Sequence, residues 1–155
     1  MSSMDVDENY RAITSNEAFK LVAPWTFVAG TTGAIGQHTL FTVTGDVVIG
    51  GFVGLVKDTL TSGGVATISV GTANNVEFMM NGSGVPITAT LLLAGNVWVD
   101  AVLAGNGHNN VEVGSMYSPQ FFINNGADIT IDILTATITG GKIDFYCLWR
   151  PLSSD

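Results

Sequence analysis

Residues 129–133 read Ile-Thr-Ile-Asp-Ile, so an apolar side chain alternates with a polar one along this stretch. Successive side chains of a β-strand point to opposite faces, and the alternation therefore predicts a strand with one buried and one polar face. Residues 66–70 (Ala-Thr-Ile-Ser-Val) and residues 97–101 (Val-Trp-Val-Asp-Ala) repeat the pattern. Glycine-containing turn sequences separate such stretches: Ser62-Gly63-Gly64, Asn81-Gly82, Gly105-Asn106-Gly107, Asn125-Gly126 and Gly140-Gly141.

Short strands separated by turns are typical of all-β folds. The sequence predicts an antiparallel jelly-roll-like β-sandwich of about eight or nine strands with an N-terminal arm. Residues 25–155 form its single domain, which is a reasonable size for one hydrophobic core. Residues 1–24 differ because they contain no glycine and carry four acidic side chains, and we interpret them as an arm or strap. A short helix is expected from Ser15 to Val22.

The last strand of the sequence is apolar on both of its faces. Its inner face would carry Ile143, Phe145, Cys147 and Trp149, and its outer face would carry Asp144, Tyr146, Leu148 and Arg150. The outer set is too apolar for simple exposure to water, so we expect it to meet another chain or the arm. Residues 128–139 and 142–150 are predicted to pair as a hairpin around Gly140-Gly141.

The composition excludes several classes of function. Five basic side chains against 13 acidic ones give a net charge of −8, which argues against a nucleic acid partner. The longest apolar run, Val47 to Val56, is shorter than the roughly 18 residues of a membrane-spanning helix, so we expect no membrane partner. The first residues lack the pattern of a secretory signal. The single cysteine, Cys147, excludes an intrachain disulfide and is expected to be a buried, inert thiol.

The low charge content points to self-association. Charged residues make up only 12% of the chain, and a compact monomer exposing roughly 7,500 Å² would carry about one charge per 400 Å². Part of that surface is therefore expected to be buried in a homo-oligomer. Residues 46–57 are apolar on both faces, with glycines where the strand must bend or another backbone must come close. We expect the oligomer interface to include Val48, Phe52, Leu55, Tyr146, Leu148 and Arg150, with Trp149 as a core anchor.

The titratable residues form no recognisable catalytic motif. His38 and His108 lie in stretches rich in glycine and amides that predict loops, and a zinc site would need both to converge with a carboxylate. The glycines at 30, 33 and 36 lack the following helix of a dinucleotide-binding loop. We therefore expect no enzyme, no cofactor and no metal site.

Three minor patterns have alternative interpretations. Asp128, Asp132 and Asp144 would approach each other in the final hairpin, where such carboxylates either hold Ca²⁺ or are simply solvated. Asn81-Gly82-Ser83 matches the N-glycosylation pattern, which we attribute to chance without a secretion signal. A sugar-stacking platform, or ordinary core and interface packing, would account for the aromatic residues Trp25, Trp98, Tyr117 and Tyr146.

Several segments resemble small structural proteins of tailed bacteriophages. The resemblance extends from about Phe41 to Ser153 and lies in strands and turns rather than in a catalytic motif. The segments that carry it are residues 40–47 (Leu-Phe-Thr-Val-Thr-Gly-Asp-Val), 66–73 (Ala-Thr-Ile-Ser-Val-Gly-Thr-Ala), 87–90 (Ile-Thr-Ala-Thr), 98–101 (Trp-Val-Asp-Ala) and 143–153 (Ile-Asp-Phe-Tyr-Cys-Leu-Trp-Arg-Pro-Leu-Ser).

This resemblance implies a virion component that is assembled in the host cytoplasm. The expected role is that of a capsid decoration protein, which oligomerises, often as a trimer, and docks on the phage major capsid protein. The N-terminal arm or a rim loop would grip the shell. The alternative is a carbohydrate-binding or receptor-binding module of a phage fibre or baseplate, with Trp25, Trp98 or Tyr117 stacking on sugars and Asn109 and Asn110 supplying hydrogen bonds.

Overall fold

The computed structural model describes residues 19–80, 87–98 and 121–152. These residues form strands joined by turns and one short 3-10 helix. The elements are β1 (Phe19–Thr26), β2 (Gly36–Phe41), β3 (Val47–Ser62), β4 (Thr67–Thr72), β5 (Asn75–Met80), β6 (Ile87–Thr88), η1 (Ala89–Leu91), β7 (Val97–Trp98), β8 (Phe121–Ile123), β9 (Ile129–Leu134) and β10 (Ile138–Pro151). None of the helices in this described part of the chain is long enough to cross a membrane.

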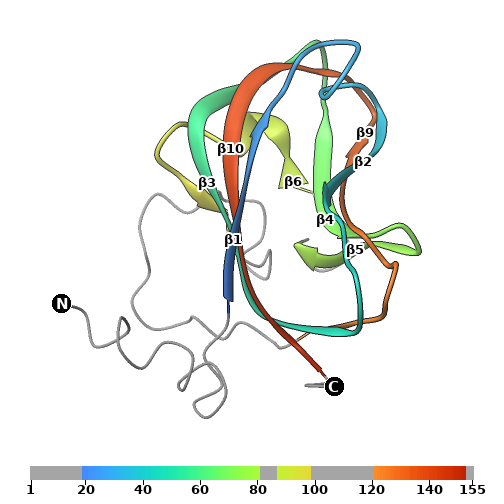
Figure 1. Ribbon diagram of the computed structural model, residues 1–155. Coiled ribbons are helices and arrows are strands. Elements are labelled where there is room, and N and C mark those ends of the chain that lie inside the picture. Colours follow the sequence, from blue (N-terminus) through green and yellow to red (C-terminus); the bar gives the residue numbers. More distant parts are fainter. Residues whose placement is uncertain (1–18, 81–86, 99–120, 153–155) are drawn as a thin grey trace, which may run out of the picture.

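The strands form two antiparallel sheets that pack face to face (Figure 1). Sheet A has the order β1-β10-β3-β7, with β8 also paired to β3; sheet B has the order β2-β9-β4-β5, with β6 paired to β4. The chain passes from one sheet to the other between β1 and β2, β2 and β3, β3 and β4, β6 and β7, β8 and β9, and β9 and β10. This alternation is the connectivity of a jelly roll. The expected all-β antiparallel sandwich is therefore confirmed.

The hydrophobic core fills the space between the sheets. The alternation of residues 129–133 is confirmed, because the three isoleucines of β9 point into this core and are at most 1% exposed. Opposite them, the fully buried ring of Phe145 lies 5.9 Å from the ring of Phe52 and 6.1 Å from that of Trp98. Such aromatic packing joins β10, β3 and β7 within sheet A.

The predicted hairpin around Gly140-Gly141 is wrong. β9 belongs to sheet B and β10 to sheet A, so the chain changes sheets between them rather than folding back in one plane. The change occurs next to Thr135, whose φ of +67° makes the turn. Gly141 lies inside β10 at a bulge, where a Cβ would come within 2.7 Å of the Leu60 Cα. Glycine is needed there for close approach of two backbones, not for a hairpin loop.

The first strand also corrects the sequence analysis. β1 begins at Phe19 and pairs with β10 along its whole length. The helix expected over residues 15–22 is therefore wrong from Phe19 on, and residues 19–24 belong to sheet A rather than to an arm. Pro24 is tolerated because β1 is an edge strand, where a missing N–H need not break a ladder. Residues 1–18 lie outside the described part.

A β-bulge in β3 decides which of its side chains face outward. Opposite β10, Leu148 pairs with Gly51 and Trp149 with Ile49, so Gly50 is an extra residue. One extra residue reverses the alternation of a strand. The even-numbered side chains of β3 therefore face outward before the bulge and inward after it.

Candidate functional site

The outer surface of sheet A is apolar at its centre. Tyr146 of β10 lies in register between Val22 of β1 and Val53 of β3. The neighbouring outward side chains on these strands include Leu148 and Leu55. Val22 is 44% exposed and Leu148 42% exposed, whereas the other three are partly buried. We call these five residues face A.

Glycine allows the apolar side chains of face A to lie flat on the sheet. A Cβ on Gly51 would stand 3.2 Å from Leu148 Cδ1, so the leucine side chain occupies the space above that glycine. On the inner surface, Phe145 lies in the same way against Gly54, 3.2 Å from a would-be Cβ. The close approach expected at these glycines is therefore made by side chains and not by another backbone.

Cations lie at both ends of face A. Lys20 pairs in register with Leu148, and Arg150 is two residues further along β10. Lys142 lies on the opposite side, with its Nζ 3.7 Å from Asp144 Oδ1. These three residues are the majority of the five basic side chains in a chain that carries 13 acidic ones. Face A is thus an apolar surface with a basic border at its Leu148 end, whereas Lys142 at the other end is paired with Asp144.

The structure divides the six predicted interface residues into two groups. Leu55, Tyr146 and Leu148 lie on face A and Arg150 lies at its border, and their role in an oligomer stays a prediction. Val48 and Phe52 are wrong, because they are 2% and 7% exposed and have almost no surface to offer a partner. Phe52 follows the bulge and therefore points into the core. Val48 is on the outer side but is covered within the chain, between its register partners on β8 and β10.

The candidate Ca²⁺ ligands do not come together. Asp128 precedes β9 and Asp132 lies on it in sheet B, whereas Asp144 lies in sheet A, because the hairpin expected to join them does not form. Asp128 Oδ1 instead accepts a hydrogen bond from the Val43 N–H at 2.9 Å. In the described ranges no three His, Cys, Asp or Glu side chains are grouped as a metal site would require.

His38 lies in β2, not in a loop as expected. Its ring contacts that of Trp25 with a centroid distance of 5.9 Å, and Nε2 is 2.8 Å from the Ala34 carbonyl oxygen. Trp98 is 2% exposed in the core, while Tyr146 faces outward from sheet A. The aromatic residues proposed as a sugar platform are thus split among three environments wherever the structure describes them.

Other sequence predictions lie outside the described residues. They concern Asn81-Gly82-Ser83, the end of the predicted strand 97–101, His108, Asn109, Asn110 and Tyr117.

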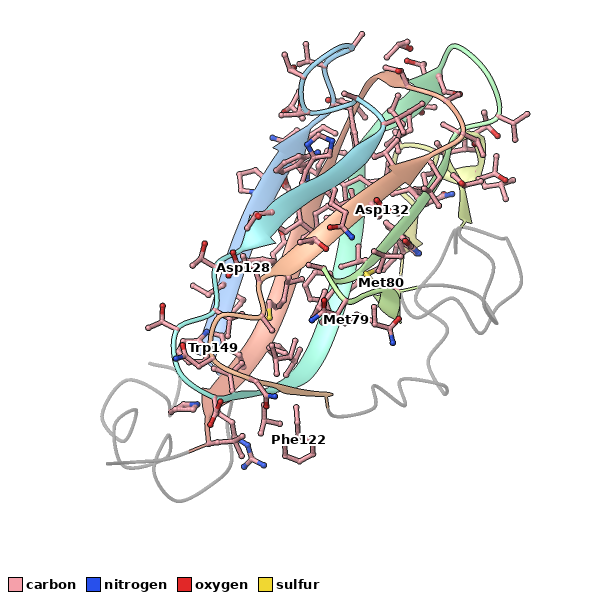
Figure 2. All side chains as sticks on the ribbon, turned by 90° about the vertical axis from the view of Figure 1, so that its right-hand side faces the viewer. Met79, Met80, Phe122, Asp128, Asp132 and Trp149 are labelled. Carbon is pink, nitrogen blue, oxygen red and sulfur yellow. The ribbon has the colours of Figure 1, made fainter. Side chains whose placement is uncertain are left out.

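The edges of the two sheets leave a pocket between β1 and β2. The ring contact of Trp25 with His38 closes one end of this seam. At the other end, which Trp149 marks in Figure 2, a cavity of about 170 Å³ opens between the sheets. Its lining consists of Leu21, Phe41, Thr42, Val43, Thr44, Val47, Ile49, Ile129, Cys147 and Trp149. Of these residues, sequence periodicity places Ile129, Cys147 and Trp149 on an inward face, and it does not show where two sheet edges separate.

Cys147 contributes the thiol of this pocket. It faces inward and is 2% exposed, which confirms the expectation of a buried thiol. Burial raises the pKa of Cys147 to about 12, because a thiolate loses its hydration there. At neutral pH the group is therefore a neutral, weakly polar wall of the pocket.

Sheet B carries a row of buried polar side chains that the sequence did not reveal. Ser69, Thr130 and Asp132 alternate with core residues, yet they are at most 6% exposed. Within the described structure, Ser69 Oγ and Thr130 Oγ1 make no hydrogen bond. Burial raises the pKa of Asp132, and the nearby His38 opposes this shift. The sequence pattern alone predicts that such side chains face water.

Comparison with protein-family models and with curated proteins finds no match for this chain.

Proposed function

We propose that this chain is a non-enzymatic structural subunit of a tailed-phage virion, which self-associates through face A and decorates the capsid. The observation that carries the proposal is face A itself. Two of its large apolar residues, Val22 and Leu148, stay more than 40% exposed although the chain buries a hydrophobic core elsewhere. A contiguous exposed apolar surface of this kind is typical of an interaction site.

The distribution of charge favours a head-to-tail contact over a two-fold one. In a two-fold dimer, face A would meet its own copy, so Lys20 and Arg150 would lie against face A of the partner and not against its acidic surface. A head-to-tail contact instead places this basic border against the acidic remainder of the next subunit. Such contacts close into rings, and a trimer is the smallest ring. A stable contact of this kind buries about 800 Å² on each partner.

The resemblance of the sequence to small phage structural proteins supports the virion as the location. The jelly-roll connectivity agrees with this role, since jelly rolls occur in viral capsid domains, and also in lectins. The major capsid protein is the proposed docking partner.

The proposal is tested by sedimentation equilibrium of the full chain, followed by immunogold electron microscopy of particles from the phage that carries the gene. We expect a trimer at micromolar concentration and gold label on the heads. Label on fibres or the tail tip would support the receptor-binding alternative and contradict decoration. A species of 16.2 kDa alone would contradict self-association.

A further inference from the structure

We propose that the pocket between β1 and β2 binds a small uncharged hydrocarbon group, of the size of one aromatic ring or a short alkyl chain. The pocket lies on the inner side of β1, whereas face A is on its outer side. This inference is therefore independent of the proposed function.

The volume of the pocket indicates the size of the ligand. Its volume is about 170 Å³. In another protein, an engineered apolar cavity of about 150 Å³ lined by Leu, Ile and Phe stays free of water and binds benzene. The present cavity has the same kind of lining, with Phe41 and Trp149 offering aromatic surfaces and Ile49 and Ile129 aliphatic ones. A single ring or a chain of a few carbons fills such a volume.

The chemistry of the lining selects against charge. Thr42 and Thr44 supply the only hydroxyl groups among the lining residues, and no ionised side chain lines the pocket in the part of the chain described. Burying an unpaired charge there would be costly. The charged head group of a fatty acid is therefore disfavoured inside the pocket.

The pocket is held open by its surrounding loop. The Gly126 N–H donates to the Val43 carbonyl at 3.1 Å, and the Gly45 N–H donates to Asn125 Oδ1 at 2.8 Å. The Leu152 N–H donates to the Asp46 carbonyl at 2.9 Å. These bonds tie residues 42–46 to other segments than β1, so this wall does not depend on contact with β1. A preformed site loses little entropy when a ligand enters.

Leu21 lies at the entrance of the pocket. It lies on the edge strand β1, lines the pocket and is 46% exposed. A larger side chain at this position would cover the opening without being forced into the core. Leu93 is a matched control, because it is 47% exposed and does not line the pocket.

The test is titration of the full chain with fluorobenzene, followed by fluorine NMR, with 4-fluorobenzoate as the charged ring that carries the same fluorine label. We expect saturable binding of fluorobenzene and no saturable binding of 4-fluorobenzoate. The affinity for fluorobenzene should be at least about tenfold lower in Leu21→Trp but unchanged in Leu93→Trp. Bound fluorobenzene should also slow the reaction of Cys147 with methyl methanethiosulfonate, a small neutral thiol reagent.

Three results would overturn the proposal. They are no saturable binding of fluorobenzene up to its solubility limit, equal binding of 4-fluorobenzoate, and unchanged affinity for fluorobenzene in Leu21→Trp. The measurement is repeated on Leu148→Asp, which removes an apolar contact of face A. If fluorobenzene binds only to this variant, a neighbouring subunit fills the pocket, and the site for a free ligand is refuted while self-association is supported.

Discussion

Replacing Leu148 by alanine measures how much face A contributes to assembly. Burying a leucine side chain completely is worth about 1.5–3 kcal/mol. Because 42% of Leu148 is still exposed in the single chain, a partner that covers the rest would gain about 0.6–1.3 kcal/mol. Loss of this free energy lowers the association constant of each subunit contact by about three- to ninefold. In a ring of three equal contacts the effects multiply, so the trimerisation constant should fall by about two orders of magnitude.

The assay is sedimentation equilibrium of wild type, Leu148→Ala and the control Leu93→Ala. Leucine 93 is 47% exposed on the turn after η1 and has no place on face A. The alanine also removes contacts that Leu148 makes within the chain, above Gly51, so urea unfolding is measured in parallel to show that the variant is folded at the assay temperature. An association constant that is unchanged in Leu148→Ala, or that falls equally in Leu93→Ala, would refute the assignment of face A.

Three further changes test the fold. Burial raises the Asp132 pKa from 3.8, so the folded state holds this proton more tightly than the unfolded state, and the free energy of unfolding falls as pH rises from about 3.8 through the folded pKa. Asp132→Asn cannot ionise, so urea unfolding should show its stability relative to wild type improving between pH 3.5 and pH 7; the opposite trend would contradict the burial of this carboxylate. Phe145→Ala removes a fully buried ring and should cost about 3–5 kcal/mol of unfolding free energy, and a loss below about 1 kcal/mol would mean that the core is not packed around it. Gly141→Ala should destabilise the protein by more than about 1 kcal/mol, since φ is +114° and the new Cβ meets Leu60 Cα. The control Gly63→Ala, which has open space around it, should change thermal stability little, and equal effects would refute the close approach.

The local pattern of the sequence determined the strands. Alternating side chains in residues 66–70 and 129–133 identified β4 and β9 because the period of two is a property of the extended backbone itself. The same periodicity placed Cys147 inward and Tyr146 and Leu148 outward, so part of the candidate site was predictable. These predictions needed only the nearest neighbours along the chain.

Only the tertiary structure decided which strands share a sheet. Gly140-Gly141 has the composition of a hairpin turn, yet β9 and β10 separate into different sheets because β10 finds its partners in β1 and β3. Likewise, the bulge at Gly50 depends on register with β10, and it sends Phe52 inward although its sequence neighbours suggest an interface. Such pairings join residues about 100 positions apart, and local propensity does not encode them.

Neither the pocket nor the row of buried polar side chains on sheet B could be predicted from the sequence, and the physical reason is the same for both. Alternation in the sequence shows which side of a strand is apolar, but the separation of two sheet edges depends on how the sheets twist and pack. Alternation in the sequence also places Ser69 and Asp132 on the polar side of their strands, but it does not show that this side is buried. Face direction is thus a local property of the chain, whereas burial and cavities arise only when distant strands meet.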